Sequence, residues 1–548
     1  MSADPTESSP TLPHTAEHFD AVIIGAGFSG MYQLLKLRDH LRLKVVVLEM
    51  ADGVGGTWHW NRYPGARCDS ESHSYCYYFD DALVKDWEWT ERYPGHEEIR
   101  SYLNHVADRY RLRPDIRLNT KVRTARYDAH DNVWVIDTDG GPGYTAQFLI
   151  TAVGCLSAAN VPDIPGLANF SGHWVHTGQW PHEGVDFRGK RVGMIGTGST
   201  GIQCAPEIAK TAAHLTVFQR TANYSMPANN GPLSAEFKQY VREHSDEIRQ
   251  VMHSTPNAHA FRFHDRSAFD VSADEREAIY EEAWRTGGLQ FRASFRDLLS
   301  DQAANDTAAE FIKSKICQIV RDPVKAAILS DIDHPFAAKR PPIDTHYFET
   351  FNRVNVSLVN LRADPIEAIV PTGIKTRDAL FELDIIVFAT GFDALTGPLL
   401  RIGIEGRNGV RLAHAWREGP RNYLGLQVPG FPNLFMITGP GSPSVLTNMP
   451  VAIEQHVEWI TECIAHMRKR GLSKIEPIES AADAWLMQVQ AAANATLLPR
   501  AHHSWYLGAN IPGKPRVFMP YAGGLPHYRK LCEQVVERGY DGFEFTGL

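Results

Sequence analysis

Two short apolar segments, each followed at once by a glycine-rich turn, constrain the fold of this chain more than any other feature. The first is residues 20–24, followed by GAGFSG at 25–30, and the second is residues 190–195, followed by GTGSTG at 196–201. Glycines at this spacing turn the backbone tightly from a strand into a helix, whose free N–H groups bind a diphosphate. Further apolar strands follow at 44–48 and 215–218. The pattern predicts an α/β fold with two Rossmann-like dinucleotide-binding domains.

The second strand of each unit ends in a different side chain, which distinguishes the two cofactors. Glu49 follows the first and can accept hydrogen bonds from ribose hydroxyls, whereas it would repel a 2′-phosphate. Gln219 and Arg220 follow the second, and a guanidinium holds a 2′-phosphate through charge-assisted bonds of about 1.5–3 kcal/mol. Alone, Arg220 would be an ordinary solvated charge. Beside a glycine turn it indicates NADPH, and Glu49 indicates FAD.

The residues of the two turns are therefore expected to contact the cofactors. For FAD these are Gly25, Gly27, Phe28, Ser29 and Gly30, and for NADPH they are Gly196, Thr197, Gly198, Ser199, Thr200 and Gly201.

Composition and charge exclude several other classes of protein. Of the 548 residues, 43% are hydrophobic and 22% are charged, which is typical of a globular chain. A net charge of −9 gives no general attraction to nucleic acid or anionic membranes, and no apolar run reaches the length of a membrane span. Neither partner is expected, and the N-terminus has no secretion signal. Seven scattered cysteines without a C-x-x-C pair indicate a reducing compartment, so we expect a cytoplasmic protein with no disulfide framework and no metal site.

The organisation of the chain follows from these motifs. Residues 1–19 are expected to form a disordered tail, 20–160 and 392–548 a discontinuous FAD-binding domain, and 161–391 the NADPH-binding domain. A helical period at about 230–339 predicts a helical insertion in the latter, with capping boxes at Ser272/Glu275 and Thr307/Glu310. Pro206 is expected to shorten or kink the helix after the second glycine turn.

Between the two glycine turns, residues 170–181 read FSGHWVHTGQWP. This segment matches the F-x-G-x-x-x-H-x-x-x-W signature of the class I Baeyer-Villiger monooxygenases. The chain resembles this family from Asp20 onward. Similar segments are GVGGTW at 53–58, NRYPGARCD at 61–69, KRP at 339–341, ATG at 389–391 and SWYLGAN at 504–510. GPGSPSVL at 439–446 is more similar to the phenylacetone and steroid monooxygenase branch. Small departures are MYQ at 31–33 and His59 in TWHW.

The resemblance implies a reaction and a catalytic cation. NADPH reduces the flavin, O2 adds to give a C4a-peroxyflavin, and the peroxide attacks a ketone, so that an ester or lactone forms. The resemblance assigns Arg340 to the flavin's reactive edge and Asp69 to holding it, a role that suits arginine because it stays protonated in proteins. Without the resemblance, Arg340 would be read as a surface charge and Asp69 as a turn residue.

The resemblance also implies further contacts and a monomer. Lys339 joins Arg220 at the 2′-phosphate, and Trp505 lies against the nicotinamide. The expected FAD contacts are Thr57, Trp58, Asp69, Tyr75, Val122 and Met449.

Two other functions stay open at this point. One is an N- or S-oxidising flavin monooxygenase, against which Trp180 and the Lys339–Arg340 pair argue. The other is a non-catalytic, redox-sensing flavoprotein. His176 is expected to belong to a hinge at 170–180 and not to act as a chemical catalyst. The sequence does not predict which ketone is the substrate.

Overall fold

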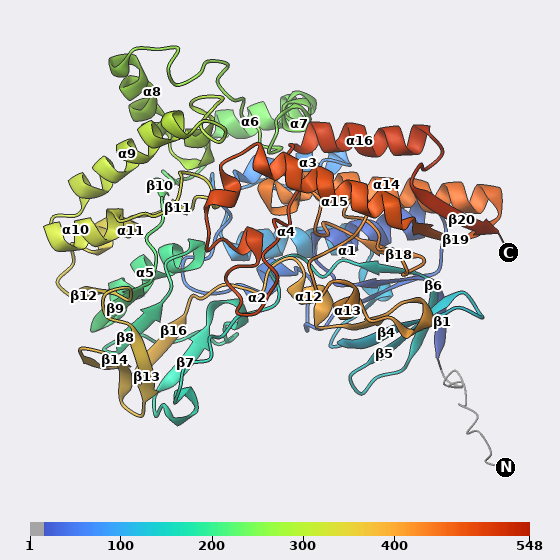
Figure 1. Ribbon diagram of the computed structural model, residues 1–548, viewed down its shortest axis with the longest axis horizontal. Helices are drawn as coiled ribbons and strands as arrows, with labels where there is room; N and C mark the ends of the chain where they lie inside the picture. Colours follow the sequence, from blue (N-terminus) through green and yellow to red (C-terminus); the bar gives the residue numbers. More distant parts are fainter. Residues whose placement is uncertain (1–15, 548) are drawn as a thin grey trace.

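The computed structural model describes residues 16–547, and most of its strands belong to two sheets that lie side by side (Figure 1). The larger sheet has the order β17-β4-β5-β6-β1-β2-β3, with β18 paired to β6. Its strands are β1 (Glu17–Ile24), β2 (Val45–Leu48), β3 (Ile116–Arg117), β4 (Val122–Asp128), β5 (Val133–Thr138), β6 (Tyr144–Thr151), β17 (Gly403–Glu405) and β18 (Leu434–Met436). Residues 1–15 of the predicted tail lie outside the described residues. Residues 17–19 do not belong to a tail, because they pair with β6 and lengthen β1.

The second sheet has five parallel strands in the order β12-β9-β8-β16-β7. They are β7 (His173–His176), β8 (Arg191–Ile195), β9 (His214–Gln219), β12 (Val356–Asn360) and β16 (Ile385–Phe388). Smaller sheets pair β10 (Met226–Pro227) with β11 (Ile343–Asp344), β13 (Ile366–Val370) with β14 (Gly373–Thr376) and β15 (Leu380–Glu382), and β19 (Leu472–Pro477) with β20 (Phe543–Gly547). Each main sheet therefore contains one of the two predicted βαβ units, with the paired strands β1 and β2 in the first sheet and β8 and β9 in the second. The domain boundaries inferred from the sequence stay predictions.

The helices cover the sheets and fill the predicted insertion. The longer ones outside the insertion are α1 (Phe28–Leu35), α4 (His96–Arg109), α5 (Ser199–Thr211), α14 (Met449–Arg470), α15 (Glu479–Asn494) and α16 (Leu525–Glu537). The insertion contains α6 (Ala235–Glu243), α7 (Ser245–Ser254), α8 (Ala273–Thr286), α9 (Gln302–Ile319) and α10 (Pro323–Ser330). None of the helices within residues 16–547 is long and apolar enough to cross a bilayer.

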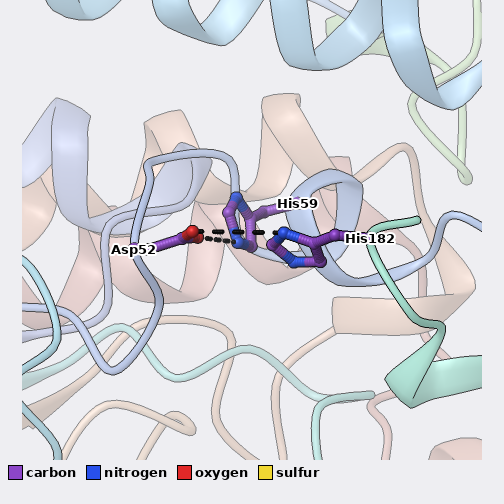
Figure 2. Close-up of side chains that lie close together, drawn as sticks. All are labelled: Asp52, His59 and His182. Atoms are coloured by element: carbon purple, nitrogen blue, oxygen red, sulfur yellow. Dashed lines mark ion pairs between the residues drawn. The ribbon is translucent and has the colours of Figure 1, made fainter.

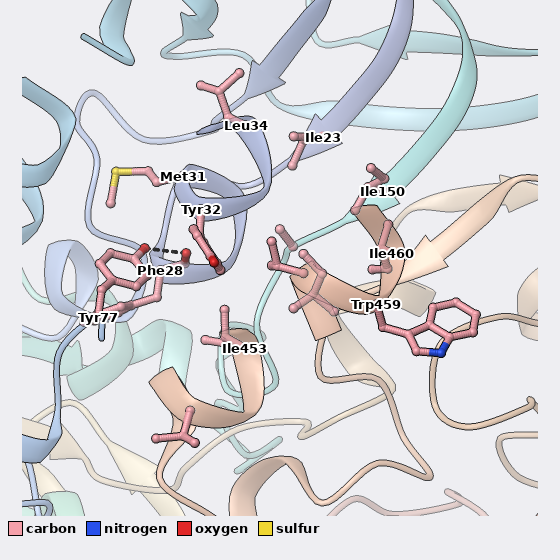
Figure 3. Close-up of a cluster of buried hydrophobic side chains, with 14 of the residues drawn as sticks. Ile23, Phe28, Met31, Tyr32, Leu34, Tyr77, Ile150, Ile453, Trp459 and Ile460 are labelled. Carbon is pink, nitrogen blue, oxygen red and sulfur yellow. Dashed lines mark hydrogen bonds between the residues drawn. The ribbon is translucent and has the colours of Figure 1, made fainter. Parts of the chain in front are cut away.

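The largest hydrophobic core joins segments that are far apart in the sequence. Side chains of β1, α1 and β6 pack against α14, with Met31, Leu34 and Ile460 fully buried (Figure 3). Tyr77 is buried beside α1 and donates its hydroxyl to the carbonyl of Phe28 at 2.5 Å. This packing holds the first turn of α1, which is also the second half of the first glycine motif.

The insertion contributes side chains to two different hydrophobic cores. Ile248 and Met252 of α7 belong to the core that contains α14 and α16, whereas Phe291 and Phe311 belong to the core of the second sheet. The insertion is therefore not confined to the NADPH-binding unit.

One local prediction about a helix was wrong. Thr307 lies inside α9 and donates its hydroxyl to the carbonyl of Ala304, because Asp301 already caps this helix at the N–H of Ala304. Pro206 does not end α5, which continues to Thr211. The capping prediction at Ser272 is confirmed, since its hydroxyl accepts the N–H of Glu275 at 3.2 Å.

Candidate active site

The first glycine turn has the shape of a phosphate cradle. Gly25 has a φ of +107°, and a Cβ there would lie 2.5 Å from the carbonyl oxygen of Ala152. At Gly30, a Cβ would lie 1.8 Å from the carbonyl oxygen of Gly25. Gly27 precedes α1 and offers no side-chain cap, so the first N–H groups of the helix are available to an anion. Only glycine fits at positions 25 and 30, and the geometry of the turn suits a diphosphate.

Glu49 lies directly beside this cradle. Its two carboxylate oxygens accept the N–H groups of Ala26 at 2.7 Å and of Ala51 at 2.8 Å. Burial raises the pKa of Glu49, and the two N–H donors oppose that rise. A carboxylate has about four acceptor positions, so it retains capacity for ribose hydroxyls.

The second glycine turn repeats this geometry in the other sheet. Gly196 has a φ of +112° with a Cβ position 2.3 Å from the carbonyl oxygen of Ala389, and the Cβ position of Gly201 is 2.2 Å from the carbonyl oxygen of Gly196. Gly198 offers no side-chain cap to α5, and Ser199 is exposed at its first position. Thr197 donates its hydroxyl to the carbonyl of Thr221 at 2.8 Å, and Thr200 lies in the first turn of α5. The residues present fit a second dinucleotide.

Cations gather at the carboxyl ends of β9 and β12. Burial lowers the pKa of Lys339, and the positive charges of Arg220 and Arg362 lower it further against the opposing effect of Asp333. Arg362 follows β12 by two residues, and β12 pairs with β9 so that Asn360 lies opposite Gln219. The sequence reasoning missed Arg362, which only this register brings to the site.

Gln219 has a different position from its neighbour. Its side chain is buried and donates to the carbonyl of Ile328 at the end of α10. Its amide therefore stabilises the end of β9. Among the described residues, its side chain forms no hydrogen bond with the cations of the cluster.

Arg340 and Asp69 form a bidentate ion pair between segments 271 residues apart. The guanidinium Nε lies 2.5 Å from Oδ2 and Nη2 lies 2.8 Å from Oδ1. The two side chains are only 17% and 22% exposed. Burial pushes the pKa of Asp69 upward, but the Arg340 guanidinium outweighs this and holds it below the ordinary value. The arginine is thus a permanent, oriented cation.

A strained turn provides the remaining hydrogen-bond acceptors of Arg340. Its Nη1 donates to the carbonyls of Val445 at 3.1 Å and Thr447 at 3.5 Å. Ser444, the residue before Val445, has a φ of +39°, which is unusual for a residue with a side chain. The motif at 439–446 therefore contributes the carbonyl of Val445 to the site, and the next residue, Thr447, contributes a second.

Two further groups near the pair come from the helical insertion. His259 is buried, and burial together with the charge of Arg340 lowers its pKa to about 3. Arg292 has a pKa lowered to about 10, chiefly by burial and then by Arg340. The Nε2 of His259 and the Nε of Arg292 are buried without a hydrogen-bond partner among the described residues. Nothing in the sequence around these two residues indicated a site, because no local motif contains them.

Aromatic side chains join the first cradle to the ion pair. The Nε1 of Trp58 donates to the hydroxyl of Tyr75 at 3.3 Å, and the ring of Phe28 meets Tyr75 edge-on at 5.4 Å. Burial raises the pKa of Tyr75, and the charges of Asp69 and Arg340 also act on it. These rings form an apolar wall that suits an isoalloxazine.

The other predicted cofactor contacts lie at three separate places. Thr57 begins α2 (Thr57–Trp60), next to Gly56, whose Cα approaches Gly27. Met449 and Trp505 pack in one cluster with Val445, close to the turn that binds Arg340. Val122 is buried at the start of β4, in the core on the other face of the first sheet.

The signature segment at 170–180 forms the edge of the second sheet. His176 ends β7, is 1% exposed, and accepts the N–H of Gly178 at its Nδ1. Burial lowers its pKa. Trp180 is buried against Phe187. His176 is thus held within the second unit, and among residues 16–547 no hydrogen bond or ion pair joins it to the Arg340–Asp69 pair.

Comparisons with known proteins agree with this geometry. A family model described as pyridine nucleotide-disulphide oxidoreductase matches residues 22–295. A Baeyer-Villiger monooxygenase from Pseudooceanicola batsensis is 44% identical, covering 98% of this chain and 97% of its own. The phenazine N-monooxygenase PhzNO1 from Lysobacter antibioticus is 42% identical, covering 96% and 97%.

Solved structures of relatives superpose over almost the whole chain. A steroid monooxygenase bound to NADP is 47% identical with a TM-score of 0.92, and OTEMO in complex with FAD and NADP is 43% identical with a TM-score of 0.93. Each covers 97% of this chain and 100% of the solved one. This chain belongs to the Baeyer-Villiger monooxygenase family.

Proposed function

We propose that this chain is an FAD-dependent Baeyer-Villiger monooxygenase that uses NADPH and O2 to insert an oxygen atom beside a ketone carbonyl, giving an ester or lactone. The observation that carries the proposal is the buried, bidentate Arg340–Asp69 pair, in which the guanidinium also donates to the carbonyl of Val445. Glu49 and the first cradle would hold FAD. The second cradle, with Arg220, Lys339 and Arg362, would hold NADPH.

The chemistry explains why a cation is needed there. FAD, when bound, supplies electron transfer from NADPH and the activation of O2. The attack on a ketone then needs a deprotonated oxygen nucleophile, and the resulting adduct carries negative charge on the former carbonyl oxygen. Arg340 stabilises both charges without giving up a proton, and Asp69 keeps its guanidinium in one orientation. The wall of Phe28, Trp58 and Tyr75 excludes water from the reacting atoms.

The test is the variant Arg340→Ala. Removing one preorganised donor typically costs about 2.7–4 kcal/mol of transition-state stabilisation. We expect FAD binding and NADPH oxidation to persist while ester formation falls at least about 100-fold. Arg340→Lys is the control, since it retains charge but loses the bidentate geometry, and it should lie between wild type and Arg340→Ala. Ester formation by Arg340→Ala at the wild-type rate would refute the assignment.

A second candidate, N-oxidation, is favoured by one comparison, because PhzNO1 shares 42% identity with this chain. Such a reaction attacks through an electrophilic, protonated oxygen donor and gains nothing from Arg340. Product analysis with paired ketone and N-heterocycle substrates separates the two. Oxidation of the heterocycle that survives Arg340→Ala, with every ketone unreacted in wild type, would favour the N-oxidase.

The proposal also includes a cytoplasmic monomer. All seven cysteines are free and six are buried, which suits a reducing compartment. Sedimentation of the holoenzyme across a concentration series tests the monomer.

A further inference from the structure

Asp52, His59 and His182 come together where the two nucleotide-binding units meet (Figure 2). Asp52 and His59 lie on the segment after β2, close to the FAD cradle, whereas His182 follows Trp180 at the end of the signature segment. One ligand atom from each residue lies within 4.8 Å of the others. The residues are separated in the sequence and form no metal motif, so only the fold reveals the cluster.

The three side chains have the separations of a small metal site. The Nε2 of His59 is 3.0 Å from Oδ1 of Asp52, and the Nδ1 of His182 is 4.0 Å from Oδ2. A zinc ion with ligands about 2.0–2.2 Å away places neighbouring ligand atoms roughly 3.3–3.5 Å apart. The side chains of Asp52 and His182 are 59% and 47% exposed, so they can move by the required fraction of an ångström.

His59 is built into this position rather than projecting freely. It is 4% exposed, and a Cβ at Gly53 would lie 3.1 Å from its ring, so that glycine leaves room for the imidazole. Its Nε2 is buried without a hydrogen-bond partner of normal geometry, although the Asp52 oxygen is near. The ring nitrogen and the carboxylate thus lie side by side without a hydrogen bond between them.

One contact opposes metal binding and must rearrange. The Nη2 of Arg62 lies 3.4 Å from the Nδ1 of His59. A metal at Nε2 places the ring proton on Nδ1, so this long contact would be lost. Arg62 keeps its bond from Nε to the carbonyl of His59 at 2.6 Å, which does not depend on the tautomer.

We propose that Asp52, His59 and His182 bind a divalent transition-metal ion of the zinc class, with water completing the coordination. Two imidazoles and one carboxylate suit zinc, whereas calcium and magnesium prefer all-oxygen sites. The bound ion ties the segment after β2 to the segment after Trp180, so it clamps the two units in one arrangement. A clamp of this kind slows turnover, because a flavin enzyme with two nucleotides must change arrangement between hydride transfer and oxygenation.

The experiment is zinc binding to the untagged FAD holoenzyme, measured by equilibrium dialysis against zinc chloride with metal analysis. His182→Gln and Asp52→Asn each remove one ligand. Removing even a residue that only supports a ligand costs about 10–100-fold in metal affinity, so we expect binding weakened at least about tenfold. His130→Gln is the matched control, because His130 pairs with Asp131 at 2.7 Å on the surface with no second histidine in the pair.

Two outcomes would overturn the inference. Equal zinc stoichiometry and affinity in wild type, His182→Gln and Asp52→Asn would remove the site. Specific binding that leaves NADPH turnover unchanged, in zinc and after chelation, would remove the clamp. Ketone oxidation without zinc should be unchanged in His182→Gln, so failure of this inference is distinguishable from failure of the proposed function.

Discussion

Asp69→Asn tests most sharply whether the ion pair creates the active site. The substitution keeps the shape of the side chain and one acceptor oxygen, but it removes the negative charge that faces Arg340. The guanidinium then retains one neutral amide oxygen in place of the carboxylate, together with the carbonyls of Val445 and Thr447 at 3.1 and 3.5 Å. We expect a loss of both stability and product formation.

The size of the effect follows from the geometry. Two unit charges about 4 Å apart attract each other by roughly 4 kcal/mol at an effective dielectric constant near 20, and breaking a buried pair costs about 3–5 kcal/mol. Both side chains of the pair are still about one-fifth exposed, so we reduce this to about 2–3 kcal/mol. A loss of 2 kcal/mol in transition-state stabilisation lowers the rate of ester formation about 30-fold.

The assay compares the melting midpoint of the holoenzyme and the ester formed per NADPH consumed. A midpoint lower by roughly 4–6 °C is expected, at about 2 °C for each kcal/mol. Asp186→Asn is the matched control, because Asp186 also holds an arginine through two bonds, at 2.9 and 2.8 Å, but on the exposed surface. If Asp69→Asn resembles Asp186→Asn in both measurements, the electrostatic reasoning is wrong.

The pH dependence of the same pair has a definite sign. The pKa of Asp69 is depressed in the folded state, so the pair contributes stability that is fully present above the unfolded value near 3.9. This contribution is lost as the pH falls through the folded pKa. The difference in melting midpoint between wild type and Asp69→Asn should therefore disappear in acid, and a difference that grows there would contradict the assignment.

Three other changes have distinct expected results. Gly201→Ala places a Cβ 2.2 Å from a carbonyl and should cost about 1–3 kcal/mol in thermal stability, whereas Gly198→Ala meets no atom within 4 Å and should leave the melting midpoint unchanged. Arg362→Ala should lower the ratio of kcat/KM for NADPH to that for NADH about tenfold, and an unchanged ratio would remove Arg362 from the phosphate site. Glu454 is buried with a pKa raised to about 7, so its folded form binds a proton that the unfolded chain releases, and stability falls as the pH rises from about 4.5 to 7. Glu454→Gln should flatten that fall by about 2–3 kcal/mol, measured as melting midpoints at pH 5 and pH 8.

The features that were predicted correctly from the sequence are those that depend only on residues close together in the chain. Both glycine turns, the strands around them and the capping box at Ser272 are local patterns, and each fixes a backbone shape within a few residues. The failure at Thr307 has the same origin, because the pattern is also satisfied inside a helix that an earlier residue, Asp301, already caps. Whether Thr307 caps a helix or lies inside one depends on how far the helix extends before it. A three-residue spacing contains no information on that length.

Contacts between distant segments could not be obtained in this way. Asp69 and Arg340 were paired only by the resemblance, and Arg362 reaches the second site only because β12 lies beside β9. His259 and Arg292 come from the insertion, whose helical period predicts its secondary structure but not which end meets the ion pair. Sequence patterns specify elements, and the register and packing of those elements specify the site.

The contacts between the two units suggest how one site serves two successive steps. Tyr63 and Arg67 of the first unit meet Gln203 of α5 through hydrogen bonds of 2.8 and 3.1 Å. Such bonds exchange with water at a net cost of about 0.5–1.5 kcal/mol each, whereas separating α7 from α14 and α16 would expose the buried side chains of Ile248 and Met252. A change of arrangement should therefore break the polar contacts at α5 and leave α7 attached to the FAD-binding unit. Helix α7 then stays beside α14 and α16, while Phe291 and Phe311 keep the later part of the insertion on the core of the second sheet.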